Sequence, residues 1–221
     1  MTPKNLTRNN IILLICLLIS ILFFPLLSSH RAFARDVIFT AIILFGTFSL
    51  DFKKKRQIIL IFLGAITIIF AWLDFFFPID LLNLIFFFSF FCFNVFITVF
   101  MVRHVARSKH VNLTVIINSI NGFLLVGVLG AVLLAITEVL QKFGFITDTG
   151  AISFAGSTAT GFHDYLYFSF VTLTTLGYGD ITPVSSFAKS ATILIAITGQ
   201  LYLTILIAML VGKYLRRSKK S

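Results

Sequence analysis

The fold of this chain is decided by the stretch Thr174-Thr175-Leu176-Gly177-Tyr178-Gly179-Asp180. Its two glycines alternate with larger residues, and glycine adopts positive φ angles that other residues take only at an energetic cost. A backbone that alternates between left- and right-handed conformations turns successive carbonyls to one side, and such a column can replace the water around a dehydrated cation. One copy supplies only an arc of a ring, so the stretch predicts several subunits around an axis.

The composition around this stretch is that of a membrane protein. The chain has 221 residues, of which 58% are hydrophobic and 12% charged, and its mean hydropathy is +1.03. A soluble domain carries about 25% charged residues, so this chain is expected in a bilayer. Its net charge of +10 is interpreted as basic loops facing anionic inner-leaflet lipids, with no nucleic-acid partner.

Six apolar runs predict six transmembrane helices, because about 20 helical residues cross a hydrocarbon core of ~30 Å. The runs cover residues 11–27, 37–52, 58–77, 81–102, 119–140 and the segment after Pro183 to about Gly212. A short helix is expected over residues 164–172, directly before the glycine-rich stretch, and residues 142–163 predict an outer loop. Ala32-Phe33-Ala34 leaves a second interpretation open, in which the first run is a cleaved signal sequence.

The distribution of charge orients these runs. With the N-terminus in the cytoplasm, 14 of the 18 lysines and arginines fall on the inner side, and seven of the eight acidic residues fall on the outer side. This positive-inside bias places both termini in the cytoplasm. It also requires the short helix to enter the membrane and return without crossing, which is tolerated where the backbone is buried in protein or lines a water-filled path.

These patterns predict an all-α membrane protein with a re-entrant pore helix and a selectivity filter between the fifth and sixth transmembrane helices. Residues 1–102 are expected to form a peripheral four-helix bundle, and residues 103–118 an amphipathic linker helix on the inner membrane face. Residues 119–214 are the expected pore domain, and residues 215–221 a basic cytoplasmic tail.

Residues 174–180 resemble the signature of potassium channels, departing from it at Leu176, where that family usually has Val or Ile. The likeness extends from Tyr165 to Pro183 and more loosely to Tyr214. The resemblance implies a homotetramer in which each chain contributes to four stacked K⁺ sites. These sites would be lined by the carbonyls of Thr175, Leu176, Gly177 and Tyr178 and by the Thr175 hydroxyl, with Gly179 at the mouth.

The same resemblance names residues that would support the filter. Thr174 and Asp180 flank it, and the family's Asp is held by an aromatic donor thirteen residues earlier, usually Trp and here Tyr167. A phenol can also donate a hydrogen bond, so this contact can persist. Glu138, at the outer end of the fifth run, has two interpretations. It binds backbone amides near residues 184 and 185, or it is a solvated carboxylate at the membrane interface.

The sixth run carries the candidate gate. Gly199 matches the family's hinge glycine, although buried glycines also serve close packing. Gln200 is a polar side chain near mid-membrane and is expected to face a central cavity or a neighbouring helix. An apolar stripe at every fourth residue predicts either an inner constriction that closes by dewetting or a packing face. The stripe consists of Leu203, Ile207, Val211 and Leu215.

The fourth run, residues 81–102, contains no Lys or Arg. Voltage sensors depend on a series of basic residues in that helix, so none is expected here. Six runs with an uncharged fourth resemble the small prokaryotic voltage-independent potassium channels. We therefore expect a non-enzymatic, multi-pass K⁺ channel of the prokaryotic plasma membrane, with K⁺ as the permeant ligand and no cofactor. The alternatives are a non-selective cation channel and a subunit of a K⁺ uptake transporter.

Overall fold

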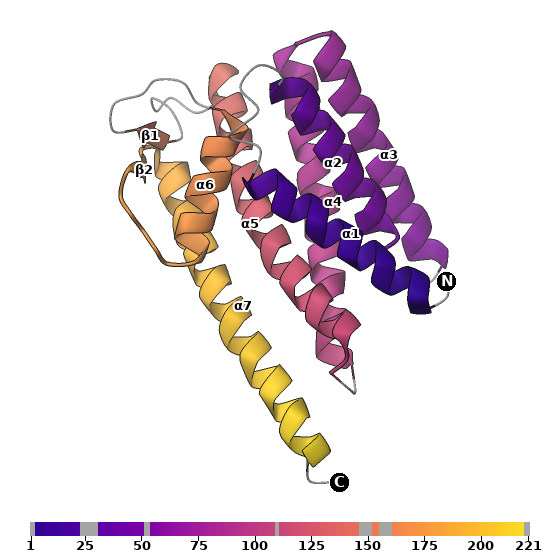
Figure 1. The fold of residues 1–221 in the computed structure, drawn as a ribbon. Coiled ribbons are helices and arrows are strands. Elements are labelled where there is room, and N and C mark those ends of the chain that lie inside the picture. The colour runs from indigo at the N-terminus through magenta and orange to yellow at the C-terminus, as the bar shows by residue number, and fades with distance from the viewer. Residues whose placement is uncertain are drawn as a thin grey trace.

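A computed structural model describes residues 3–22, 31–50, 54–108, 111–145, 152–154 and 161–218 (Figure 1). The helices are α1 (Pro3–Leu22), α2 (Arg31–Thr47), α3 (Lys54–Phe76), α4 (Asp80–Arg107), α5 (Leu113–Lys142), α6 (Phe162–Leu173) and α7 (Ser186–Ser218). Two three-residue strands, β1 (Ile152–Phe154) and β2 (Ile181–Pro183), pair antiparallel with Phe154 opposite Ile181. This small pair was not indicated by the sequence.

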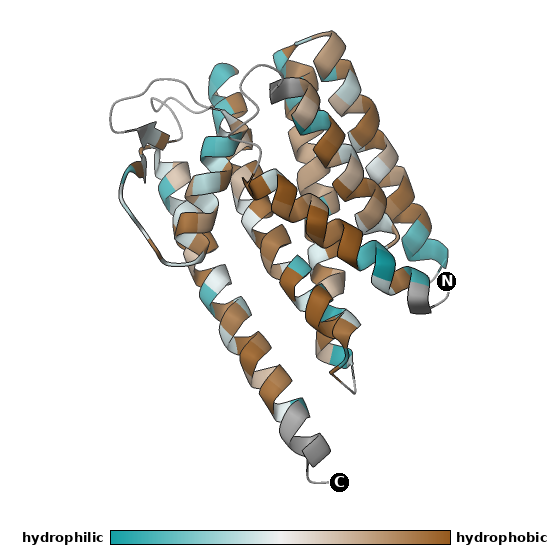
Figure 2. Ribbon diagram, in the orientation of Figure 1, coloured by the Kyte–Doolittle hydropathy of each residue, from teal (hydrophilic) through white to brown (hydrophobic). Residues whose placement is uncertain are grey.

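The long helices run side by side, and five of those in the described residues are long and apolar enough to cross a membrane: α1, α3, α4, α5 and α7. The shortest predicted span, α2, has 17 residues. Figure 2 shows apolar residues along the lengths of the helices and hydrophilic residues gathered towards their ends. This distribution is expected of a membrane protein, because the helix ends lie near water and the helix centres face lipid.

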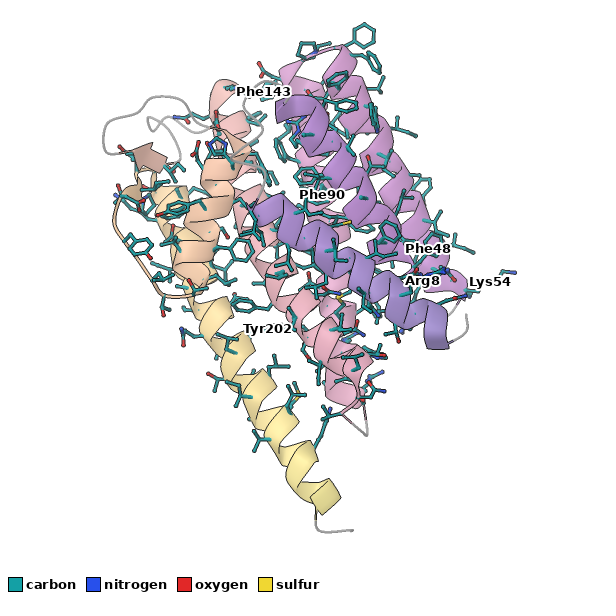
Figure 3. All side chains as sticks on the ribbon, in the orientation of Figure 1. Arg8, Phe48, Lys54, Phe90, Phe143 and Tyr202 are labelled. Carbon is teal, nitrogen blue, oxygen red and sulfur yellow. The ribbon has the colours of Figure 1, made fainter. Side chains whose placement is uncertain are left out.

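The core of the bundle is aromatic. Phe39 of α2 stacks on Phe90 of α4, with ring centroids 4.5 Å apart, and Phe86 and Phe93 are also fully buried. Figure 3 places Phe90 among the side chains between these helices. The rings join α2 to α4, and the Phe39 ring also meets the Phe162 ring of α6 edge-on, with centroids 5.1 Å apart.

Polar contacts at one end of the bundle join segments that are distant in sequence. The side-chain amides of Asn9 and Asn10 donate to the carbonyls of Phe48 and Ser49, at 3.0 and 2.9 Å. The Asn121 amide of α5 donates to the carbonyl of Asn10 at 2.9 Å. The start of α1, the end of α2 and the start of α5 therefore lie together. Arg8, Phe48 and Lys54 occupy this end, far from Phe143 (Figure 3).

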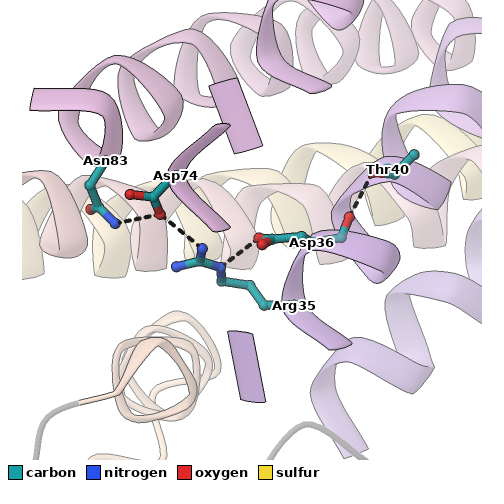
Figure 4. Close-up of polar contacts among 5 residues, drawn as sticks. All are labelled: Arg35, Asp36, Thr40, Asp74 and Asn83. Atoms are coloured by element: carbon teal, nitrogen blue, oxygen red, sulfur yellow. Dashed lines mark hydrogen bonds and ion pairs between the residues drawn. The ribbon is translucent and has the colours of Figure 1, made fainter. Parts of the chain in front are cut away.

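A charged cluster closes the opposite end of α2, α3 and α4 (Figure 4). Arg35 pairs with Asp36 at 2.8 Å and with Asp74 at 3.1 Å, and Asn83 donates to Asp74 at 3.0 Å. Asp36 is fully buried and Asp74 nearly so. The start of α2, the end of α3 and the start of α4 thus share one end, which is the alternating arrangement that the charge pattern predicts.

The predicted amphipathic helix within residues 103–118 is wrong as a separate element. Residues up to Arg107 continue α4, and Ser108 is extended, with φ −61° and ψ 130°. A new helix, α5, begins at Leu113, and the Asn112 side chain caps it by accepting from the amide of Val115 at 2.9 Å. An Asn cap satisfies a free N–H at a helix start, so it defines a break that apolar periodicity does not reveal.

Candidate functional site

The glycine-rich stretch has the backbone alternation that its sequence predicts. Positive φ angles occur at Thr175 (62°), Gly177 (57°) and Gly179 (79°), and the residues between them, Leu176 and Tyr178, are not in this conformation. The sequence indicated the two glycines but missed Thr175, because a residue with a Cβ adopts positive φ only with strain. A left-handed residue at every second position turns successive carbonyls to the same side, as a column of carbonyls requires.

Two large side chains of this stretch are exposed in the single protomer. Leu176 is 57% exposed and Tyr178 67% exposed, although both are large and apolar or aromatic.

Hydroxyl groups hold the base of the stretch. The Thr174 hydroxyl donates to the carbonyl of Phe170 at 2.7 Å, and the Thr175 hydroxyl donates to the carbonyl of Thr174 at 2.6 Å. The amide nitrogen of Gln200 lies 3.5 Å from the Thr175 hydroxyl oxygen. Gln200 of α7 is therefore located directly beneath the stretch, and its exposed side chain faces away from the body of the protomer.

A hydrogen bond links the end of the stretch to α6. The Tyr167 hydroxyl donates to a carboxylate oxygen of Asp180 at 2.6 Å. This bond raises the pKa of the Tyr167 phenol to about 12, with smaller contributions from burial and from the Asp180 charge. The other Asp180 oxygen accepts from the amide of Ile181 at 3.1 Å, at the start of β2. The contact inferred from the family resemblance, with Tyr in place of Trp, is therefore present.

The start of α6 is also fixed by carboxylates. Asp164 accepts from the amide of Gly161 at 2.8 Å and pairs with His163 at 3.1 Å, which stabilises the positive end of the helix. Glu138 of α5 accepts a hydrogen bond from the Tyr165 hydroxyl. The sequence predicts Glu138 near residues 184 and 185 or in solvent, and it does not indicate this contact, because nothing in it relates residues 138 and 165.

Glycines let the helices approach α6 closely. A Cβ at Gly127 of α5 would collide with the ring of Phe170, and one at Gly130 with the Ser169 hydroxyl. A Cβ at Gly199 of α7 would collide with the Leu173 carbonyl oxygen, in the last turn of α6. The structure thus shows Gly199 in the packing role that the sequence left open, whereas a hinge at Gly199 is not tested by this contact.

The candidate gate residues lie on the open side of α7. Ile207 is 59% exposed and Val211 51% exposed, and Leu203 is half-buried. The side chain of Leu215 lies outside the described residues. The buried residues Ala188, Ala191 and Ile195 of α7 lie in its first half, before the stripe begins. The stripe is therefore not a packing face within one protomer.

Comparisons with known proteins agree with this location of the site. Residues 123–216 match a sequence family described as "Ion channel". A 62-residue segment is 42% identical to "Two-pore potassium channel 4" of Arabidopsis thaliana, and the match covers 28% of this chain and 22% of that relative. The chain thus matches about a fifth of the relative's length. No solved structure matches the chain. The two matches support an ion channel, and the family match covers the C-terminal part of this membrane protein.

Proposed function

We propose that the protein is a potassium-selective channel that conducts K⁺ passively across the cell membrane as a homotetramer. The observation that carries the proposal is the run of alternating left-handed residues at Thr175, Gly177 and Gly179. Four such stretches around one axis would form stacked rings of carbonyl oxygens, with Thr175, Leu176, Gly177 and Tyr178 as the K⁺ ligands. Backbone carbonyls in rings are the ligands that replace the hydration shell of K⁺.

The exposure of α7 supports the assembly. In its membrane-length segment 11% of the residues are buried, against 67% for α5. A helix that lines a pore between four subunits is covered by copies of the chain and by the water of the cavity, and neither is part of one protomer. Rotational symmetry is the usual arrangement of such homo-oligomers.

The end of α6 supplies the electrostatic part of the mechanism. An α-helix carries about half a negative charge at its C-terminus, and α6 ends at Leu173, beside Gly199 and directly before the filter. In a tetramer four such ends would point towards one cavity and stabilise a cation there. Gln200 would line the same cavity beneath the Thr175 hydroxyl, and the stripe from Leu203 to Val211 would form its inner constriction.

The peripheral part of the proposal concerns topology and gating. The protein would cross a prokaryotic membrane six times, with both termini in the cytoplasm. The polar contacts at the two ends of the bundle and the basic residues of the inner loops support this topology. The absence of Lys and Arg from residues 81–102 favours gating independent of voltage. Gating currents recorded under voltage clamp should be absent; a charge movement of several elementary charges per channel would contradict this.

K⁺ flux into liposomes that contain the purified protein tests the proposal. Wild-type protein should give flux that Ba²⁺ blocks, and Gly177→Ala should abolish it, because an L-residue at φ 57° is strained by about 1–3 kcal/mol in each subunit. Gly46→Ala is the matched control, since Gly46 lies in α2, away from the proposed pore, and an added Cβ would lie 3.5 Å from the Phe93 ring, an ordinary contact distance. Flux that survives Gly177→Ala would show that the filter assignment is wrong.

A further inference from the structure

A buried cluster at one end of α2, α3 and α4 holds more negative than positive charge (Figure 4). The Arg35 guanidinium donates from Nε to Oδ1 of Asp36 at 2.8 Å and from Nη2 to Oδ2 of Asp74 at 3.1 Å. The side chain of Arg35 is 14% exposed, that of Asp74 is 7% exposed, and that of Asp36 is fully buried. With both acids ionised, two carboxylates would face one guanidinium and leave one negative charge in excess.

One oxygen atom of this cluster is unpartnered. Oδ2 of Asp36 is buried and accepts no hydrogen bond from any residue that the structure describes. The nearby Thr40 hydroxyl donates instead to the backbone carbonyl of Asp36, at 2.6 Å. Oδ2 of Asp74, in contrast, accepts from both Arg35 and Asn83. The excess charge therefore falls on Asp36, where Oδ2 has neither solvent contact nor a donor to stabilise it.

The other charged groups near this end do not offset the excess. Asp80, at the start of α4, pairs with Lys142 at 3.6 Å, and His163, at the start of α6, pairs with Asp164 at 3.1 Å. Arg8 of α1 lies at the opposite end of the bundle (Figure 3). Among the described residues, the only cation that forms an ion pair with the cluster is therefore its own guanidinium.

A proton is the cation that the unpartnered oxygen can accept. A bound metal ion needs several oxygen ligands, and no group of three or more His, Cys, Asp or Glu side chains in the described ranges could hold one. A proton needs a single oxygen atom. A buried hydroxyl without an acceptor costs far less free energy than a buried charge without a partner, so the chemistry of this site favours protonation of Asp36.

We propose that Oδ2 of Asp36 is a proton-binding site that is filled from the outer solution. Addition of one proton turns the carboxylate into a carboxylic acid and makes the cluster neutral. Oδ1 of Asp36 still accepts from Arg35, and Arg35 still pairs with Asp74. The outer location of the site rests on the membrane topology of the function proposed above, whereas proton binding rests on the cluster alone.

Aromatic contacts join the cluster to α6. The Arg35 guanidinium lies over the ring of Phe86, 5.3 Å from its centroid, and the rings of Phe86 and Phe39 have centroids 5.7 Å apart. The Phe39 ring meets that of Phe162, the first residue of α6, at 5.1 Å. Release of the proton restores the excess charge, which is stabilised only if water enters the cluster. High pH should therefore loosen the bundle beside α6.

Infrared spectroscopy of the purified protein tests the site without any measurement of conduction. A carboxylic acid has a C=O stretching band that an ionised carboxylate lacks. Exposed Asp and Glu side chains titrate near pH ~4, so they stay ionised between about pH 5 and about pH 9. In this range the wild-type protein should show a carboxylic-acid band that disappears as the pH rises. Asp36→Asn should lack the band. Asp80→Asn is the matched control and should keep it, because Asp80 is an exposed aspartate at the same end of the bundle.

Thermal unfolding over the same pH range gives a second measurement. The Asn side chain of Asp36→Asn has nearly the shape of the protonated acid and cannot titrate. In the wild-type protein the bound proton stabilises the folded state, so its contribution is complete at low pH and is lost as the pH rises through the titration of the site. The unfolding temperature should therefore fall with rising pH in wild-type and Asp80→Asn protein, and should fall less in Asp36→Asn.

Three results would contradict the proton site. They are the absence of the carboxylic-acid band from the wild-type protein in this range, a band that remains in Asp36→Asn, and equal pH dependence of unfolding in wild-type and Asp36→Asn protein. The first needs no variant to fold. A titrating band in protein that gives no K⁺ flux would contradict the channel and leave the proton site standing, and K⁺-selective flux without the band would do the reverse.

Discussion

Two long helices pack on α6, and they differ in how much of each is buried. In α5, 67% of the membrane-length segment is buried, because the peripheral bundle covers one side and α6 and α7 cover another. In α7 the corresponding share is 11%, although α7 is as apolar as a membrane span requires. The difference shows that α5 belongs to the core of one protomer, whereas most of α7 is left uncovered by its own chain, as the proposed channel assembly requires.

The largest expected effect comes from the point where α7 does touch its own protomer. Gly199→Ala places a methyl group against the Leu173 carbonyl, which is backbone and cannot rotate away. We expect a destabilisation of about 3 kcal/mol per subunit, the upper end of the range for overpacking, and loss of K⁺ flux. The measurement is thermal dissociation of the oligomer followed by gel electrophoresis, together with flux. Gly46→Ala in α2 is the control, since its Cβ would lie 3.5 Å from Phe93; equal effects at both positions would contradict the assigned contact.

A smaller effect is expected on the open face of α7. Ile197 is 52% exposed in the protomer, and Ile61 of α3 is 47% exposed. If copies of the chain cover α7 while lipid covers α3, Ile197→Ala should weaken oligomer association by about 1 kcal/mol per subunit, and Ile61→Ala should not. The cost is below that of a soluble core because lipid replaces part of the lost contact. Association measured by single-molecule photobleaching in bilayers distinguishes the two, and equal values would remove the argument for subunits around α7.

The hydrogen bonds of α6 permit a finer comparison. Tyr167→Phe removes the donor to Asp180 at the filter, and Tyr165→Phe removes the donor to Glu138 of α5. We expect the first variant to change the rate of filter inactivation severalfold with little change in unfolding temperature. The second should lower the unfolding temperature with little change in inactivation, because it loosens α6 from the protomer core. Reversed results would mean that the filter and core roles of these tyrosines are exchanged.

The smallest expected effect concerns pH: the rate of inactivation should not depend on the protonation of Tyr167 near neutral pH. The hydrogen bond to Asp180 raises the Tyr167 pKa from 10.0 to about 12. The phenol donates only while protonated, so the contact is fully present below pH 10 and is lost as the pH rises through about 12. Between pH 7 and 10 the inactivation rate of the wild-type protein should therefore show no titration of the Tyr167 phenol. Any pH dependence in this range should be the same in Tyr167→Phe. A titration midpoint within that range, lost in the variant, would contradict the hydrogen bond.

Much of the architecture could be predicted from the sequence, because apolar run length and charge placement depend on the bilayer and not on packing details. The left-handed backbone at Gly177 and Gly179 was predicted from the two glycines, whereas that at Thr175 was not, since its strain is imposed by the surrounding structure. The break between α4 and α5 depends on the Asn112 cap, which apolar periodicity conceals. The Glu138–Tyr165 and Arg35–Asp74 contacts join distant positions and become visible only when the helices are packed.

The reversal potential of the reconstituted protein tests the central claim most directly. With K⁺ on one side and Na⁺ plus a small amount of K⁺ on the other, a K⁺-selective pore should reverse near the K⁺ equilibrium potential. It should also shift by about 59 mV for each tenfold change in the K⁺ gradient. This outcome is predicted if the carbonyls of Thr175, Leu176, Gly177 and Tyr178 form the permeation path. A reversal potential near zero with equal concentrations of the two ions would indicate a non-selective pore and would contradict the account.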